Sequence, residues 1–225
     1  MNIIKRISGC KRRLNKSSRN RKVDRNRKDR KVKRIPYDEV FVQSKIFRMA
    51  AAAYGSFDNF ATCLQTLTGS YSVFFNIQIP CLTNENCTGF MALSLEDKAL
   101  ILSFGTSQYA YKQLLNDSGE YIFNERRRSP LENQLEVSDN LFSIFYQMQL
   151  AGITQKTFEM IQFFDGYDLW ITGHSIGGAI ASIAAAKIAS ANVIDAKQIK
   201  LVTFGQPRVG NKAWAAAMEN AVGNF

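Results

Sequence analysis

Residues 169–189 read LWITGHSIGGAIASIAAAKIA, and this stretch decides the fold. The apolar run over 168–172 predicts a short buried strand. Residues 177–190 are rich in alanine and isoleucine on nearly every side, which is typical of a helix surrounded by protein. The pattern G-x-S-x-G, here Gly173-His174-Ser175-Ile176-Gly177, lies between them. A strand and a helix joined in this way predict a sharp turn with Ser175 at its apex.

This turn makes Ser175 a candidate nucleophile. Its hydroxyl is expected to project beyond the edge of the sheet. Gly173 and Gly177 leave the room that the turn needs, because a side chain at either position would collide with a neighbouring strand or helix. The start of the helix offers backbone N–H groups and a positive dipole end to a developing oxyanion. The alternative is a glycine-rich turn that only joins a strand to a helix.

Other segments surround this turn with strands and helices. Residues 37–54 have helical spacing, with one face shared by Val40, Phe41, Ile46, Phe47, Met49 and Ala50. The remaining predictions are strands over 89–95, 99–104 and 199–204, a turn over 96–98, a surface loop over 116–133, and helices over 141–164 (broken near Gly152) and 211–220. Strands that alternate with helices predict an α/β fold with a parallel or mixed sheet.

The charge of the chain is concentrated at its start. Residues 1–35 hold 16 Lys/Arg against 2 Asp/Glu, a net of +14, and the rest hold 13 against 17, a net of −4. Such a basic stretch buries too little apolar area to fold, so we expect residues 1–36 to be a disordered tail and residues 37–225 to be one domain. The tail is either solvated or an interaction arm. It lacks the aromatics and modules of nucleic-acid binders, so no nucleic-acid partner is expected.

The cysteines give conflicting signs about the compartment. Cys81 and Cys87 close a short loop, IPCLTNENCTGF, in which Asn86-Cys87-Thr88 is also a glycosylation sequon. Both features suggest an oxidising, extracellular setting. The chain nevertheless begins without a secretory signal, so its localisation stays open. We expect no transmembrane segment, no metal site and no cofactor, because no apolar run is long enough and the cysteines lack zinc-ligand spacing.

Three blocks of the sequence resemble the fungal-type (class 3) lipases, and among them the lipase-like proteins of nematodes. They are LWITGHSIGGAIASIAAAKIA at 169–189, IKLVTFGQPRVGN at 199–211 and KALILSFGTSQ at 98–108. The likeness covers about residues 40–225. It implies an α/β-hydrolase with a mostly parallel central sheet and flanking helices, a Ser–His–Asp triad, and hydrolysis of acylglycerol esters at a lipid–water interface.

The resemblance also implies roles for particular residues. By position, Thr106 is the residue of the oxyanion loop, and Ile176, next after the nucleophile, contributes the second N–H. A lid is implied near 108–115, although this stretch also fits an ordinary amphipathic helix.

The sequence departs from the family in two places. The family's oxyanion loop reads F-R-G-T, whereas here Phe104-Gly105-Thr106 lacks the arginine, and such a deletion could displace Thr106. The family's aspartate and histidine lie beyond the glycine–proline–arginine turn. After Ser175 this chain has only the carboxylates Asp195 and Glu219 and no histidine. We therefore expect the fold to be incomplete at its C-terminus.

The only histidine, His174, lies inside the strand–turn–helix segment at Gly173–Gly177, which we call the elbow. A structural role is expected for it there. Without a base we expect the 225-residue chain to be nearly inactive alone. Three interpretations follow: a lipase that lacks its C-terminal part, a lipase-like protein that binds lipid or a protein without catalysis, and a nuclear or nucleic-acid-associated protein directed by the basic tail.

Overall fold

The computed structural model describes residues 38–55, 64, 71–82, 85–107, 126–128 and 135–224. The chain divides into two units, Met1–Arg30 and Lys31–Phe225. All of the first unit, and with it most of the predicted tail, lies outside the described residues.

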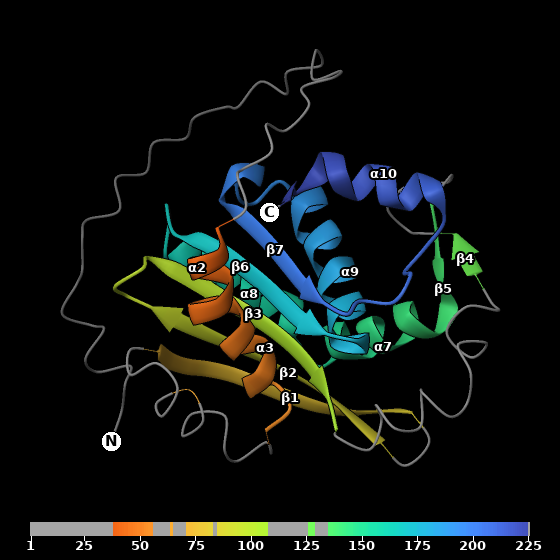
Figure 1. Cartoon of the computed structure of the whole chain (residues 1–225), viewed down its shortest axis with the longest axis horizontal. Coiled ribbons are helices and arrows are strands. Elements are labelled where there is room, and N and C mark those ends of the chain that lie inside the picture. Colours follow the sequence, from red (N-terminus) through yellow and green to blue (C-terminus); the bar gives the residue numbers. More distant parts are fainter. Residues whose placement is uncertain are drawn as a thin grey trace. The chain divides into compact units, whose positions relative to one another are not determined.

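A six-stranded sheet forms the centre of the second unit (Figure 1). Its strands, in spatial order, are β1 (Tyr71–Leu82), β2 (Glu85–Ser94), β3 (Ala99–Thr106), β6 (Asp168–His174), β7 (Ile199–Phe204) and β8 (Gly223–Asn224). The β1–β2 and β2–β3 pairs are antiparallel, whereas β3–β6, β6–β7 and β7–β8 are parallel. The sheet is therefore mixed, and the predicted α/β fold with flanking helices is confirmed.

The antiparallel part of the sheet extends further than the sequence predicted. The two expected strands and their turn correspond to β2 and β3, with Lys98 at a φ of 49° in the turn. No strand was predicted before residue 89, but β1 spans Tyr71–Leu82 and β2 already begins at Glu85. Cys81 and Cys87, which were expected to close a short loop, lie on these two paired strands and are joined by a disulfide.

One face of the sheet carries a helix built from α2 (Glu39–Phe41), the π-helical segment η1 (Val42–Ile46) and α3 (Phe47–Ala52). The predicted helix is confirmed, but its predicted buried face is wrong at Val40 and Phe47, which are 75% and 55% exposed. Ile46, Met49 and Ala50 of the predicted face are buried, and so is Val42, which was not assigned to it. The π-helical segment explains the exposure of Phe47, since its wider turn rotates the residues that follow it relative to an ideal α-helix.

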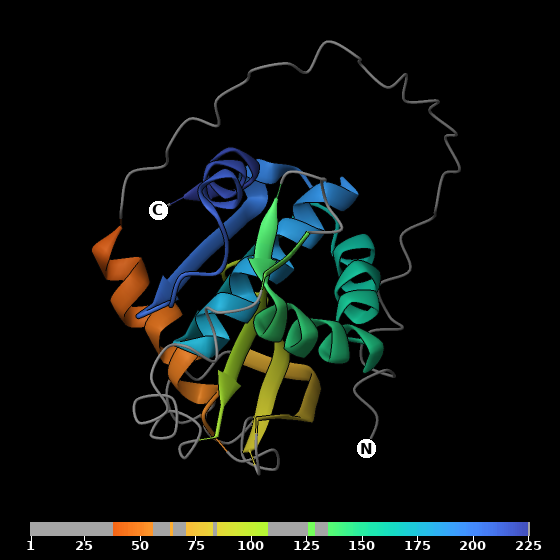
Figure 2. The same ribbon diagram turned by 90° about the vertical axis from the view of Figure 1, so that its right-hand side faces the viewer.

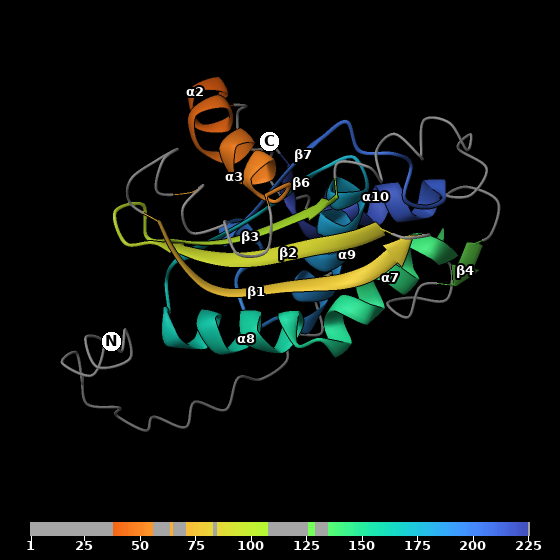
Figure 3. The ribbon, with the colours of Figure 1, turned by 90° about the horizontal axis from the view of Figure 1, so that it is seen from below.

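The opposite face is covered by α7 (Asp139–Leu150), α8 (Ile153–Phe163) and α9 (Ile176–Ala191), as Figures 2 and 3 show. The break between α7 and α8 falls at Gly152, whose φ of 97° suits glycine. As predicted, α9 is buried on nearly all sides. The remaining elements are η2 (Ala196–Gln198), α10 (Lys212–Ala221), and a second small sheet of β4 (Arg126–Arg128) and β5 (Glu136–Ser138).

The sheet thus separates two hydrophobic cores. The larger lies between the sheet and α7–α9 and includes Leu100, Leu102 and Phe104 of β3. The smaller lies under α3 and includes Ile101 and Trp170. Successive side chains of a strand point to opposite faces, and β3, which is buried along its whole length, contributes to both cores.

Candidate active site

Ser175 lies at the junction of β6 and α9. Its backbone has φ 54° and ψ −124°, a conformation that residues with a side chain rarely adopt. Its N–H donates to the Phe204 carbonyl at 2.9 Å, and its carbonyl accepts the Ala179 N–H at 3.1 Å. The chain thus leaves the sheet and enters the helix within a single residue, and that residue is Ser175.

Gly173 and Gly177 allow this turn to pack closely. A Cβ added at Gly173 would lie 2.4 Å from the carbonyl oxygen of Gly177, and a Cβ at Gly177 would lie 2.3 Å from the carbonyl oxygen of Phe104. Real Cβ atoms do not approach backbone so closely, so both sites require glycine. The first turn of α9 therefore rests directly on the backbones of β3 and β6.

Thr106 lies at the end of β3, at the same edge of the sheet as Ser175. Phe104 is paired with Gly173 in the parallel β3–β6 register, and Thr106 and Ser175 each follow two residues later. Thr106 is buried, and Cys87 of β2 lies opposite it, so β3 stays in the sheet through Thr106. The carboxyl ends of β3 and β6 thus bring these two residues to one edge.

The backbone of Thr106 is directed towards β6. The Ser107 N–H donates to the Asn86 carbonyl at 2.9 Å, which makes this pair a hydrogen-bonded one. Pairs in an antiparallel ladder alternate, so the adjoining Thr106–Cys87 pair is a non-hydrogen-bonded one. The N–H of Thr106 therefore faces away from β2 and towards the strand that carries Ser175.

Ile176 begins α9 and is buried. The first N–H groups of a helix have no partner within the helix, and the positive end of the helix dipole lies beside them. This end of α9 can therefore stabilise negative charge next to Ser175.

The end of α3 supports the elbow through a contact that the sequence did not predict. The Tyr54 hydroxyl lies 2.6 Å from Nδ1 of His174, the residue before Ser175. Tyr54 was missed because 120 residues separate it from His174, and no local signal reports such a contact. A structural role was expected for His174, and the structure brings its ring against Tyr54 of the N-terminal helix.

The two carboxylates that follow Ser175 lie away from it. Asp195 precedes β7 and accepts the Lys197 N–H at 3.0 Å, so it caps η2 at the amino end of β7. Glu219 is exposed on α10. The site therefore contains the serine and the oxyanion candidates from the predicted set, but neither of these acids.

Three further expectations concern the lid, metal binding and membrane-spanning segments. The predicted lid near 108–115 lies outside the described residues. Within the described ranges, no three His, Cys, Asp or Glu side chains gather as a metal site would require. Among those same residues, no helix has the length and apolar character needed to cross a bilayer.

Comparisons with known proteins agree with this architecture. A curated relative, Lipase ZK262.3 of Caenorhabditis elegans, is 38% identical over 91 residues, which span 36% of this chain and 26% of the relative. The chain thus matches about a quarter of that protein.

Two solved structures illustrate the likeness of the fold. A lipase from Rhizopus microsporus var. chinensis has a TM-score of 0.68 at 15% identity, covering 84% of this chain and 66% of that one. The mono- and diacylglycerol lipase from Aspergillus oryzae has a TM-score of 0.67 at 20% identity, covering 84% and 70%. The family model described as Lipase (class 3) matches residues 101–225. The chain therefore belongs to the class 3 lipase family and has the α/β-hydrolase fold of these serine ester hydrolases.

Proposed function

We propose that this protein cleaves carboxylic esters of acylglycerols, with Ser175 as the nucleophile and the N–H groups of Thr106 and Ile176 as the oxyanion hole. The backbone of Ser175 carries the proposal. Its positive φ at the junction of a parallel strand and a buried helix is the conformation that presents a nucleophilic serine in this fold.

In the proposed reaction the Ser175 hydroxyl oxygen attacks the ester carbonyl carbon, and a base accepts the hydroxyl proton. The carbonyl oxygen becomes an oxyanion, which the two N–H groups stabilise. Collapse of this intermediate releases the alcohol, which takes up a proton, and leaves an acyl group on Ser175. Water then hydrolyses the acyl-enzyme to the free carboxylic acid.

The proton transfer from Ser175 is the step for which these 225 residues are least equipped, because it needs a general base. His174 is the only histidine, and its Nδ1 already contacts the Tyr54 hydroxyl at 2.6 Å. Removal of triad members from serine hydrolases costs about 10⁴–10⁶ in turnover. We therefore propose that the chain by itself reacts slowly with esters, and that an external base raises the rate.

The proposed substrate class rests on the family and on the printed names of its relatives, which include a mono- and diacylglycerol lipase. A lipid–water interface is the proposed site of action, with residues 108–115 as a lid. In this proposal the basic residues 1–36 form a separate tail and residues 37–225 carry the chemistry.

The test is covalent labelling of the 225-residue chain with a fluorophosphonate, followed by mass spectrometry of the modified peptide. We expect an adduct on Ser175 that forms faster when imidazole is added as a base. Ser175→Ala removes the adduct. Ser190→Ala, which alters an exposed serine on the same helix, is the matched control and leaves labelling unchanged.

Absence of an adduct both with and without imidazole contradicts the proposal. It favours the alternative, a lipase-like protein that binds lipid or a protein partner without catalysis. The missing arginine before Gly105 is the sequence feature that supports this alternative.

A further inference from the structure

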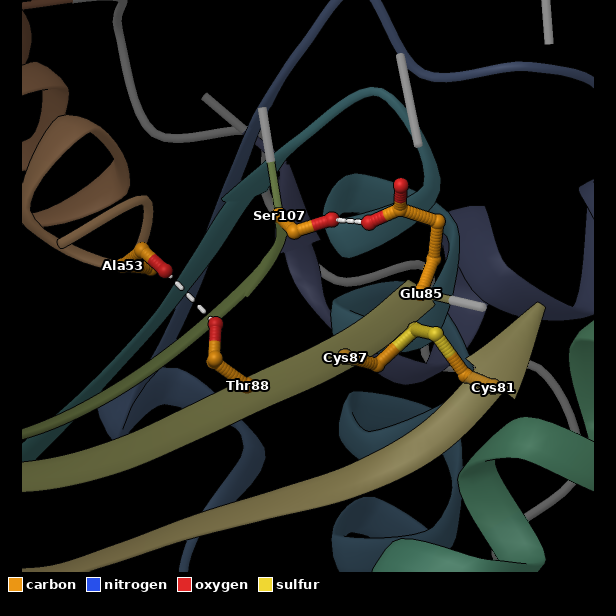
Figure 4. Close-up of a disulfide and its surroundings, with 6 residues drawn as sticks. All are labelled: Ala53, Cys81, Glu85, Cys87, Thr88 and Ser107. Atoms are coloured by element: carbon orange, nitrogen blue, oxygen red, sulfur yellow. Dashed lines mark hydrogen bonds between the residues drawn. A yellow bond between two sulfur atoms is a disulfide. The ribbon is translucent and has the colours of Figure 1, made fainter. Parts of the chain in front are cut away.

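A disulfide closes the hairpin end nearest to Thr106. Cys81 of β1 is bonded to Cys87 of β2, with the two Cα atoms 5.5 Å apart (Figure 4). β1 is the edge strand of the sheet and pairs only with β2 among the described strands. The disulfide therefore fixes the end of the edge strand to the start of β2, at the edge of the sheet where β3 ends.

Cys87 is the direct cross-strand neighbour of Thr106. The Thr106–Cys87 pair is of the non-hydrogen-bonded kind, in which the side chains share one face and lie closest together. Both residues are buried. Any displacement of Cys87 is therefore transmitted to Thr106 by direct packing.

The neighbouring residues repeat this connection. The Ser107 N–H donates to the Asn86 carbonyl at 2.9 Å, and the Ser107 hydroxyl donates to the Glu85 carboxylate (Figure 4). The first residues of β2 thus hold Thr106 and Ser107 through a backbone bond, a side-chain bond and a packed cross-strand pair.

The disulfide spans a sequence separation of only 6 residues. A loop this short removes less entropy from the unfolded chain than a long one. Its main effect is therefore expected to be local, at the ends of β1, β2 and β3, while the buried cores on both faces maintain the fold.

We propose that the Cys81–Cys87 disulfide and Glu85 position Thr106 for catalysis. This proposal rests on the proposed oxyanion role of Thr106. Together, Cys81, Cys87, Glu85 and Ser107 form a brace that fixes the direction of the Thr106 N–H. Reduction by a dithiol converts the disulfide to two thiols and the dithiol to its own cyclic disulfide. The loosened β3 end then presents the N–H less accurately, which slows the chemical step and leaves the initial binding of the probe unchanged.

The first test needs no activity. Amide hydrogen exchange is compared between the oxidised chain and Cys81→Ser/Cys87→Ser, with the Ser107 amide as the readout. We expect exchange there to be about tenfold faster or more, because local opening becomes easier, with no change over 169–189. Unchanged exchange at Ser107, or an equal increase over 169–189, overturns the proposal.

The second test uses fluorophosphonate labelling of Ser175, resolved into an inactivation rate constant and an apparent binding constant. Misplacement of a catalytic group by 1 Å costs about 100-fold, so we expect a 10- to 100-fold lower rate constant in the double variant and an unchanged binding constant. Glu85→Gln is expected to lower the rate constant less. Glu159→Gln, which removes an exposed carboxylate on α8, is the matched control and leaves it unchanged.

The two tests separate the two proposals. If the oxidised chain is not labelled at all, the proposed function fails, and hydrogen exchange alone decides whether the brace holds the end of β3. If the oxidised chain is labelled and the double variant is labelled at the same rate, the positioning role is overturned while the proposed function stands.

Discussion

The Tyr54 hydroxyl lies 2.6 Å from Nδ1 of His174. This contact ties the end of the N-terminal helix to the last residue of β6, directly before Ser175. Tyr54 lies outside the part of the chain that the family model matches, which begins at residue 101. The elbow therefore depends on residues from both halves of the chain.

We predict that Tyr54→Phe destabilises the protein by about 1 kcal/mol, because the half-buried His174 loses a hydrogen-bond partner while the ring packing stays. For a domain of this size the melting temperature falls by about 2–4 °C. Thermal unfolding followed by circular dichroism measures the change. Tyr146→Phe, at a tyrosine that is 45% exposed on α7, is the control. Equal melting temperatures for all three proteins contradict a structural role for this contact.

Gly177 and Gly178, at the start of α9, differ in how closely their backbones approach neighbouring atoms, so alanine substitutions at the two positions test this packing. We predict that Gly177→Ala costs about 3 kcal/mol or more, because its Cβ would lie 2.3 Å from the backbone oxygen of Phe104 and the strand cannot yield. Gly178→Ala is the matched control, since the nearest atom to its Cβ lies at 3.1 Å. There alanine costs less than about 1 kcal/mol, partly offset by its better helix propensity.

Urea denaturation with a common m-value compares the two glycine variants. Near-equal midpoints would mean that α9 can move away from β3. The elbow would then be less rigid than the packing of Gly177 against Phe104 indicates.

The elements on either side of Ser175 were predictable because their signals are local. The apolar run before Gly173, the alanine-rich helix after Gly177 and the break at Gly152 each depend on a few neighbouring residues. The edge strand β1 carried a local signal as well, since apolar residues occupy alternate positions from Tyr71 through Ile77 to Ile79. That alternation would have identified the strand, which was not predicted.

Other features could not be predicted because they arise only when distant segments meet. The Tyr54–His174 contact depends on how the N-terminal helix packs on the sheet. The pairing of Cys87 with Thr106 depends on the register of β2 and β3. Neither can be read from local sequence patterns. The exposed position of Phe47 depends on a π-helical segment that periodicity at 3.6 residues cannot show. The candidate site was thus predictable at Ser175 and its flanking glycines, and not at the contacts that distant segments make with it.

The Thr88 hydroxyl donates to the Ala53 carbonyl at 2.6 Å, in a buried contact between β2 and the end of α3. We predict that Thr88→Val, which keeps the shape and removes the hydroxyl, costs about 1–3 kcal/mol because the Ala53 carbonyl loses this donor in a buried position. Thr88→Ser keeps the hydroxyl and is expected to cost less. The free energy of unfolding in urea distinguishes the two. A valine variant as stable as the serine variant would refute the importance of this bond.

The lowered pKa of Asp97, in the β2–β3 turn, is expected to make the stability of the protein depend on pH. Burial raises the pKa of its carboxyl, but hydrogen bonds from Lys45, Ser94 and Tyr71 outweigh burial, and the pKa lies below its usual value. An acid with a lower pKa in the folded than in the unfolded state contributes stability above its unfolded pKa of about 3.9. This contribution is lost as the pH falls through the folded pKa.

We therefore predict that Asp97→Asn lowers the free energy of unfolding at pH 7 by about 1–2 kcal/mol, since the asparagine keeps the shape but not the charged acceptor. The difference from the original protein shrinks as the pH falls from about 5 to below 3. Glu159→Gln is the control, because Glu159 is paired only at the exposed surface of α8, where such pairs contribute little. Urea denaturation at a series of pH values measures both variants. A difference that stays constant from pH 7 to below 3 would show that Asp97 acts through its shape and not through its charge.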